Sequence, residues 1–193
     1  MKNEIKKYYE ELSSAMKGIV GSDASGDTFE VEEAIERAVA WVARQKATDG
    51  KLIFIGNGAS AAIASHQAVD FWKATKIPAL SFNDGALLTC ISNDFGYENV
   101  FEKPLEVFLD PKDILIAISS SGESENILRA AAAAKKKKAR IITLSGFKHT
   151  NRLRKLGDLN FYVPALEYGF IEVTHHSICH CILDILVKHS CAV

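Results

Sequence analysis

Residues 114–127 read ILIAISSSGESENI, an unbroken apolar run followed by a serine-rich turn and the start of a helical pattern. A short apolar run bounded by turn residues is typical of a strand buried on both faces of a parallel sheet. Residues 52–60, LIFIGNGAS, have the same order of strand, turn and helix start. Strands that alternate with helices need crossover connections, so the two stretches predict an α/β fold.

Similar apolar runs complete a set of five expected strands, at 52–56, 77–82, 114–119, 139–146 and 159–164. We predict a three-layer α/β sandwich, in which a doubly wound, five-stranded parallel sheet of flavodoxin-like order 2-1-3-4-5 carries helices on both faces. The helical spacing of apolar residues also predicts a long last helix, over about 168–190.

Two further helices are expected before the first strand, over residues 3–20 and about 29–46. The glycine- and serine-rich segment 21–27 is expected to be a flexible connector between them. The length of 193 residues suits one domain of ordinary size. We therefore expect a single domain over 1–193, with N-terminal helices in 1–48 and the α/β core with its last helix in 49–193.

Charge and hydropathy argue against two classes of partner. The formal net charge of −1 disfavours a broad electrostatic grip on nucleic acid. The basic stretch at 131–140 closes an expected helix, where lysines complement the helix dipole. No uninterrupted apolar run of about 18 residues is present, so no transmembrane helix is expected. The N-terminal segment lacks the apolar core of a signal peptide.

The four cysteines show no CxxC pair and no disulfide-framework spacing; they are Cys90, Cys179, Cys181 and Cys191. Reduced thiols are the expectation for such a chain. We therefore expect a cytoplasmic protein that binds neither nucleic acid nor a membrane.

Two loops that follow strands carry the residue types that bind anions. Glycines at 56–60 allow a tight turn, and the helix start behind them offers free N–H donors. At 119–124, four serines flank a glycine before another helix start, which makes a phosphate cradle that needs no lysine. Serine is also a good N-cap residue, but one serine is enough for capping. Four within six residues favour an anion site.

The predicted strand order brings these two loops together. In the order 2-1-3-4-5, the strands at 52–56 and 114–119 are neighbours, and their helices leave toward opposite faces of the sheet. The crevice between them is the topological switch point, where ligands bind in open α/β sheets. Strand order and residue chemistry therefore select the same place.

A dinucleotide is the first ligand to consider, because Gly56-x-Gly58-x-x-Ala61 fits the GxGxx(G/A) fingerprint formally. That fingerprint also wants an acidic residue at the end of the next strand, and Asp84 is only a loose candidate. The serine cradle has no role in such a site. We therefore expect no NAD.

Histidines and carboxylates recur at helical spacing in two places. His66 and Asp70 form an i, i+4 pair on one helix face, and Glu172, His176 and His180 repeat at the same interval on the last helix. Imidazole and carboxylate ligands suit zinc. Eight residues of helix separate the Cα atoms of Glu172 and His180 by about 12 Å, so they serve one site only if their side chains converge or if the site lies at a subunit boundary.

Four motifs resemble the sugar-isomerase (SIS) fold family and, within it, the phosphoheptose isomerases: GNGAS at 56–60, NDFGYENVF at 93–101, AISSSGESENI at 117–127 and IEVTHHSICH at 171–180. The resemblance covers nearly the whole chain. It implies that the phosphate is held by Ser119, Ser120, Ser121 and Ser124. It implies that the rest of the substrate meets Asn57, Gly58, Ala59, Ser60, Asp70, Asn93, Asp94 and Glu172.

The same resemblance implies a catalytic set of Asp70, Glu172 and His180, and a zinc site drawn from His66, Asp70, Glu172 and His180. The family usually carries Glu at the position of Asp70, Gln at that of Glu172 and Gly at that of Ala59. These departures leave open whether Asp70 or Glu172 is the base. His175 and His176 have no family assignment, and His176, between Glu172 and His180, is a surrogate ligand candidate.

The function implied is an aldose–ketose isomerase that converts sedoheptulose 7-phosphate to D-glycero-D-manno-heptose 7-phosphate through an enediol, for lipopolysaccharide or capsule heptose. A homotetramer with active sites at subunit interfaces is implied as well. Two alternatives remain: a non-catalytic SIS protein that binds a sugar phosphate or a partner protein, and an isomerase of another phosphosugar. The non-catalytic reading predicts loss of the acid–base residues, whereas this chain keeps His66, His180 and a carboxylate at 70.

Overall fold

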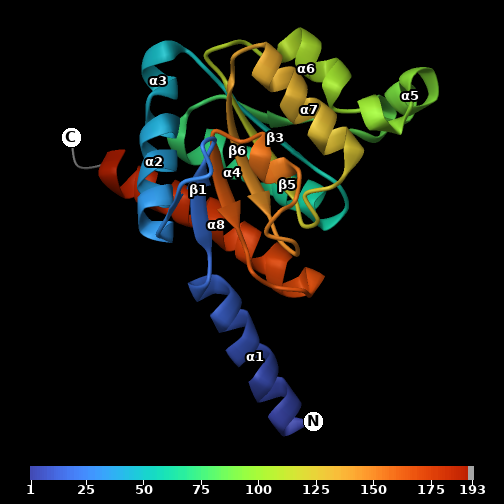
Figure 1. The fold of residues 1–193 in the computed structure, drawn as a ribbon. Coiled ribbons are helices and arrows are strands. Elements are labelled where there is room, and N and C mark those ends of the chain that lie inside the picture. The colour runs from blue at the N-terminus through green and yellow to red at the C-terminus, as the bar shows by residue number, and fades with distance from the viewer. Residues whose placement is uncertain (191–193) are drawn as a thin grey trace.

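A seven-stranded sheet runs through the computed structural model, which describes residues 1–190 (Figure 1). Its strands lie in the order β2-β1-β7-β6-β5-β3-β4. Their bounds are β1 (Val20–Asp23), β2 (Thr28–Phe29), β3 (Leu52–Gly56), β4 (Ala79–Ser81), β5 (Ile114–Ser119), β6 (Arg140–Ser145) and β7 (Leu159–Tyr162). Five neighbouring strands are parallel, in the spatial order β4-β3-β5-β6-β7. This is the predicted order 2-1-3-4-5, so the doubly wound α/β sandwich is confirmed.

The expectation of a flexible connector at 21–27 is wrong. β1 pairs antiparallel with β7, from Val20 opposite Tyr162 to Asp23 opposite Leu159, and β2 pairs with β1. β7 would otherwise present an unpaired edge, and β1 satisfies its free backbone groups. The Asp23 carboxylate accepts from the N–H groups of Ser25 and Asp27, which closes the turn between β1 and β2. The sheet therefore has two strands more than predicted.

Eight α-helices and two short 3₁₀ helices accompany the sheet in the described part of the chain. The α-helices are α1 (Lys2–Lys17), α2 (Val31–Ala43), α3 (Gln45–Thr48), α4 (Ala59–Thr75), α5 (Gly85–Phe95), α6 (Glu102–Phe108), α7 (Glu125–Lys136) and α8 (Tyr168–Ser190); the 3₁₀ helices are η1 (Tyr97–Asn99) and η2 (Leu153–Lys155). The expected helix over 29–46 is thus divided at Arg44 into α2 and α3, whereas the long last helix is confirmed as α8.

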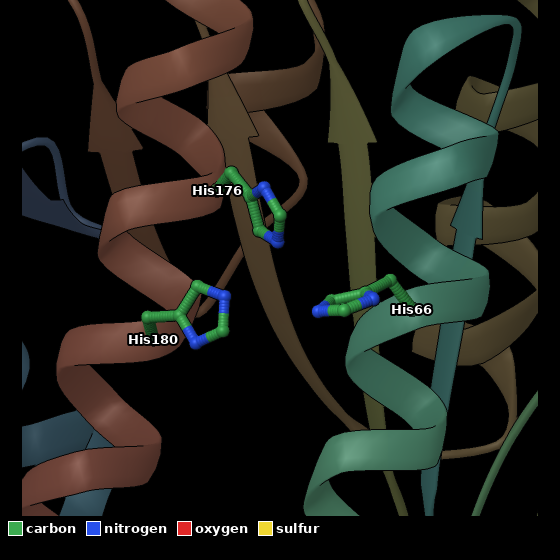
Figure 2. A group of neighbouring side chains, drawn as sticks. All are labelled: His66, His176 and His180. Carbon is green, nitrogen blue, oxygen red and sulfur yellow. The ribbon is translucent and has the colours of Figure 1, made fainter.

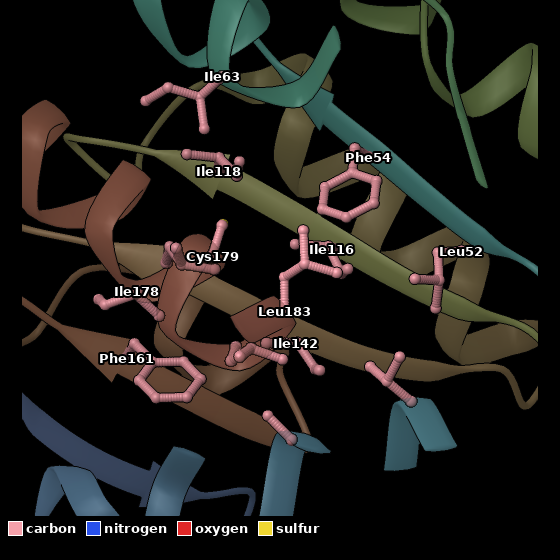
Figure 3. Close-up of a cluster of buried hydrophobic side chains, with 14 of the residues drawn as sticks. Leu52, Phe54, Ile63, Ile116, Ile118, Ile142, Phe161, Ile178, Cys179 and Leu183 are labelled. Atoms are coloured by element: carbon pink, nitrogen blue, oxygen red, sulfur yellow. The ribbon is translucent and has the colours of Figure 1, made fainter. Parts of the chain in front are cut away.

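Helices cover both faces of the sheet because successive residues of the central strands point to opposite sides. Leu52 and Phe54 of β3 pack with α2, α4 and α8 in one core cluster, part of which is shown in Figure 3. Ile53 and Ile55 pack with α6 and α7 in the other. β3 and β5 are buried along their whole length, as their continuous apolar sequences predict.

α8 is the one helix in the described part of the chain whose length and composition would allow it to cross a membrane, over Tyr168–His189. Half of that stretch is buried inside the protein. Ile178, Ile182 and Leu183 pack in the same core cluster as β3 and β5, and core packing of this kind accounts for the helix's apolar composition. That the protein has no membrane partner stays a prediction.

Two cysteines of α8 differ in burial. Cys179 is buried, and burial raises the pKa of its thiol to about 12. Cys181 and Cys90 are exposed, and all three are free thiols, as expected. Cys191 lies outside the described residues.

A buried carboxylate ties the start of β3 to the start of β5. Asp113 is fully buried; it accepts from the Lys51 ammonium at 2.5 Å and from the backbone N–H groups of Lys51 and Asp110 at 2.9 and 2.7 Å. Removing one partner of a buried ion pair leaves the other charge uncompensated. The pair therefore fixes where the two central strands begin.

We expect Asp113→Ala to lower the free energy of unfolding by about 3–5 kcal/mol, because three donors lose their acceptor. Asp110→Ala is the matched control: the Asp110 carboxylate lies 3.4 Å from the same Lys51 ammonium but is 61% exposed, so its loss should cost less than about 1 kcal/mol. Urea denaturation measures both. Equal effects in the two variants would show that the buried pair does not fix the strands.

Candidate functional site

A cavity of about 270 Å³ lies at the ends of β3 and β5. The two strands are parallel neighbours, with Gly56 opposite Ile118, so the loops that follow them meet at one edge of the sheet. α4 then packs on one face and α7 on the other, as at a topological switch point. The cavity is lined by Asn57, Gly58, Ala59, Ser60, Ile118, Ser119, Ser120, Ser121, Ser124, Tyr168 and Glu172.

The serine loop presents hydroxyl groups to this cavity in a fixed arrangement. Ser119 accepts from the backbone N–H of Gly122 at 3.2 Å and lies 3.5 Å from the Ser124 hydroxyl. Ser121 accepts from the backbone N–H of Glu123 at 3.2 Å. Gly122 has φ +64°, and a Cβ there would collide with the side chain of Asn151, so the turn requires glycine.

The loop is also fastened from outside the cavity. Glu123 accepts from the guanidinium of Arg152 at 2.8 Å and from its backbone N–H at 2.9 Å. The carbonyl of Gly122 accepts from the N–H of Leu153 in η2. Hydroxyl donors at the start of α7 are therefore held ready for an anion, which a helix N-terminus also attracts.

The glycine-rich loop is joined to the serine loop's helix by a pair of amides. Asn57 donates to the Asn126 side-chain oxygen at 2.9 Å, and Asn126 donates back to the Asn57 oxygen at 2.8 Å. The Tyr97 hydroxyl donates to the same Asn57 oxygen at 3.0 Å. The Asn57 oxygen is therefore fully engaged, and one N–H of this amide has no partner among the described residues and is free for a ligand.

Three imidazoles converge beside this cavity, from α4 and α8 (Figure 2). His66, His176 and His180 each offer a ring nitrogen, and these atoms lie within 4.8 Å of one another. The ring centroids of His176 and His180 are 4.6 Å apart, and those of His66 and His176 are 5.1 Å apart. A cluster of this kind can hold a transition-metal ion.

The cluster fits a metal because the neutral form of His176, the form that binds metals, is favoured. Burial lowers the pKa of His176, and the neighbouring His180 and His66 lower it further. The Nε2 atom of His176 is buried and has no hydrogen-bond partner in the described part of the chain. His175, the preceding residue, points elsewhere: it is fully buried, contacts the Ser145 carbonyl at 3.2 Å, and burial lowers its pKa to about 4.

The two candidate carboxylates occupy different places. Asp70 lies beside the histidines: one oxygen is 2.9 Å from Nε2 of His66, and the other accepts from Lys73 at 3.0 Å. The hydrogen bond from Lys73 lowers the pKa of Asp70, and the charge of His66 acts in the same direction. Glu172 instead borders the serine cavity and a second cavity of about 370 Å³, which His176 and His180 also line.

The structure brings together most of the residues expected from the sequence but separates two of them. Asn93 and Asp94 belong to the last turns of α5, are exposed and border neither cavity. Two neighbours were missed. Tyr168 lines the serine cavity, and Asn126 holds Asn57. Asn126 follows the serine cluster by two residues, but its partner lies 69 residues away, so no local pattern marks it.

A family model of the SIS domain matches residues 22–146, well over half of the chain. Fold and site thus define a SIS-domain protein. The chain is 30% identical to a phosphoheptose isomerase of Helicobacter pylori, across 98% of this chain and 95% of that protein. It is 34% identical to one of Photorhabdus laumondii, across 81% and 83% respectively.

Comparison with a solved structure also indicates a phosphoheptose isomerase fold. The phosphoheptose isomerase GmhA from Neisseria gonorrhoeae superimposes with a TM-score of 0.84 at 26% identity, covering 96% of this chain and 97% of that one. The chain therefore belongs to the phosphoheptose isomerase family.

Loss of the amide pair should loosen the two loops. We expect Asn126→Ala to weaken binding of inorganic phosphate, measured by calorimetry, and to lower the free energy of unfolding by about 1–3 kcal/mol, since a buried amide partner is lost. Arg129→Ala, at an exposed position one turn further along α7, should change stability by less than about 0.5 kcal/mol and leave phosphate binding unchanged. Unaltered phosphate binding in Asn126→Ala would contradict the role given to the pair.

Proposed function

We propose that the protein interconverts sedoheptulose 7-phosphate and D-glycero-D-manno-heptose 7-phosphate. One observation carries the proposal. The serine cavity, which suits a phosphate, adjoins a second cavity lined by two histidines, and Glu172 borders both. An extended sugar phosphate can thus reach from the serines to the acid–base groups.

The serines act on the part of the substrate that does not react. Ser119, Ser120, Ser121 and Ser124 bind the phosphate, and the backbone of the 57–60 loop meets the neighbouring hydroxyls. The free energy of this binding positions the other end of the sugar. Asn93 and Asp94, which lie away from the cavity in one chain, meet substrate only if a second subunit brings them to a neighbouring site.

The reaction moves a proton between C1 and C2. It requires a base near the carbon acid, a proton donor for the oxygen and stabilisation of the enediolate. His180 and a carboxylate, Asp70 or Glu172, supply the proton transfers. His66, His176 and His180 would hold a zinc ion, which, when bound, stabilises negative charge on the substrate oxygen.

The test is to incubate the purified protein with sedoheptulose 7-phosphate and to follow the aldose product by NMR. We expect turnover, and we expect Ser121→Ala to raise KM, because a lost hydrogen bond to a charged group costs about 1.5–3 kcal/mol. Binding of the sugar phosphate without turnover would favour the non-catalytic SIS protein. Turnover of a shorter phosphosugar alone would move the substrate assignment to another isomerase.

Exposed apolar side chains on α1 favour the association of several subunits. α1 projects from the body of the protein (Figure 1), and Ile5 and Tyr9 are 53% and 65% exposed on it. Apolar side chains gathered on a projecting helix mark an interaction surface. We propose a cytoplasmic homotetramer in which the active sites lie at subunit interfaces.

The protein should elute at four times its 21.2 kDa subunit mass in size-exclusion chromatography with light scattering. Replacing both Ile5 and Tyr9 by serine should shift it to smaller species, because the apolar contact is lost. Lys6→Ser, a charged neighbour on the same helix, is the control. A stable monomer with full isomerase activity would refute the assembly.

A further inference from the structure

We infer that the protein has a second anion site, separate from the serine cavity, which takes the phosphate group of a small molecule. The site is a cavity of about 350 Å³ between the turn that joins β1 to β2 and the segment that contains η2. A volume of this size is within the range of small-molecule pockets. Residues 22–26 and 149–151, with Arg154 and Lys155, line it, and none of them lines the serine cavity. The inference does not depend on the isomerase function.

Arg154 is the main reason to expect an anion there. It is half-buried, and it forms no ion pair with a carboxylate of the described residues, whereas Arg152 contacts both Glu123 and Glu125. Burial lowers the pKa of the Arg154 guanidinium, as expected for a positive charge that is partly desolvated without an anionic partner. A charge held in this way is stabilised when an anion enters the cavity.

The Arg154 guanidinium is fixed in place but keeps donors to spare. It donates to the His149 carbonyl at 2.8 Å and to the Ser22 hydroxyl at 3.2 Å, and it lies 4.8 Å from the centre of the Tyr162 ring. The Tyr162 hydroxyl in turn donates to the Phe147 carbonyl at 2.8 Å. Two of the five guanidinium N–H groups are thus engaged, and the others have no partner among the described residues. A guanidinium held in one plane is suited to a phosphate, which it binds through two parallel hydrogen bonds.

The charges around the cavity also favour an anion. Arg154 and Lys155 bring two positive charges, and Asp23 is the one acidic residue of the lining. Its Oδ1 atom accepts from two backbone N–H groups of the β1–β2 turn, at 2.9 and 3.2 Å, so this carboxylate is used in the turn. Ser25 and Thr150 add hydroxyl groups to the lining. Two cations match a phosphate group, which carries about −1.5 to −2 charges at pH 7.

Asn151 makes the two anion sites neighbours without merging them. Asn151 is buried and borders the cavity, and its side-chain oxygen accepts from the Arg154 N–H at 3.2 Å. The same side chain packs against Gly122 of the serine loop, where a Cβ would collide with it. Phosphate can therefore bind at either place, and binding at the two sites has to be measured separately.

The test is a titration of the protein with inorganic phosphate, followed through backbone amide resonances in NMR. Gly26 and Thr150 report the new cavity, and Gly58 reports the serine cavity. We expect all three to shift in the wild type. In Arg154→Gln, the phosphate concentration at the midpoint for Gly26 and Thr150 should rise about 10-fold or more, because a hydrogen bond to a charged group is lost. The midpoint for Gly58 should stay the same.

Two controls separate a built site from general charge. Lys148→Gln removes a positive charge from an exposed residue of the same loop that does not line the cavity, and it should leave the Gly26 and Thr150 midpoints unchanged. Ser121→Ala should weaken the response of Gly58 and leave that of Thr150 as in the wild type.

A second pair of variants tests the site without touching Arg154. Ser25 is exposed, and only its backbone N–H holds the turn, so replacing the side chain leaves that contact in place. Ser25→Glu puts a negative charge at the cavity and should abolish the phosphate response of Thr150, whereas the uncharged Ser25→Gln should retain it. Equal responses in these two variants, or a shift of Gly58 without any shift of Gly26 and Thr150 in the wild type, would overturn the site. A response of Gly26 and Thr150 to malonate but not to phosphate would overturn the assignment of the ligand class.

Discussion

β3 and β5 lie side by side and parallel, with Gly56 opposite Ile118, so both strands end at the same edge of the sheet. Their helices leave toward opposite faces, which keeps the space between the two loops open. The buried Asp113–Lys51 pair fixes the other ends of these strands. The Asn57–Asn126 amides then hold the loops at a set separation. The position of the serine loop is therefore a consequence of strand pairing, and its chemistry is a consequence of the loop residues.

The packing of α8 against α4 is the second requirement, because it brings the histidines together. Small residues on α4, including Ala64 and Ala68, are buried in the core between the helix and its neighbours. Burial lowers the pKa of His176, and the neighbouring His180 and His66 lower it further. A neutral imidazole can bind a metal cation, and binding of that cation to the folded state would stabilise the fold.

The parallel sheet could be predicted because each of its strands is an apolar run buried on both faces. β1 and β2 could not, since Gly21, Ser22 and Asp23 have little strand propensity and pair only because β7 offers a free edge. The glycines and serines of the two loops were enough to locate them in the sequence. The role of Asn126 could not be predicted, because it depends on a contact with Asn57, which is distant in sequence. Helical spacing marked His176, whereas the separate places of Asp70 and Glu172 depend on how α8 is rotated against α4, which is a tertiary property.

α8 connects the two halves of the site through its own periodicity. Glu172, His176 and His180 follow one another at single-turn intervals, so they share one face of the helix at increasing distance from the serine loop. The first of them borders the serine cavity, and the second and third meet His66. The carboxylate at 172 and the imidazole at 176 therefore belong to different parts of the site. The imidazole at 176 joins the histidine cluster, and the carboxylate at 172 lies between the two cavities. The same carboxylate one turn further along α8 would lie among the imidazoles and away from the serine cavity.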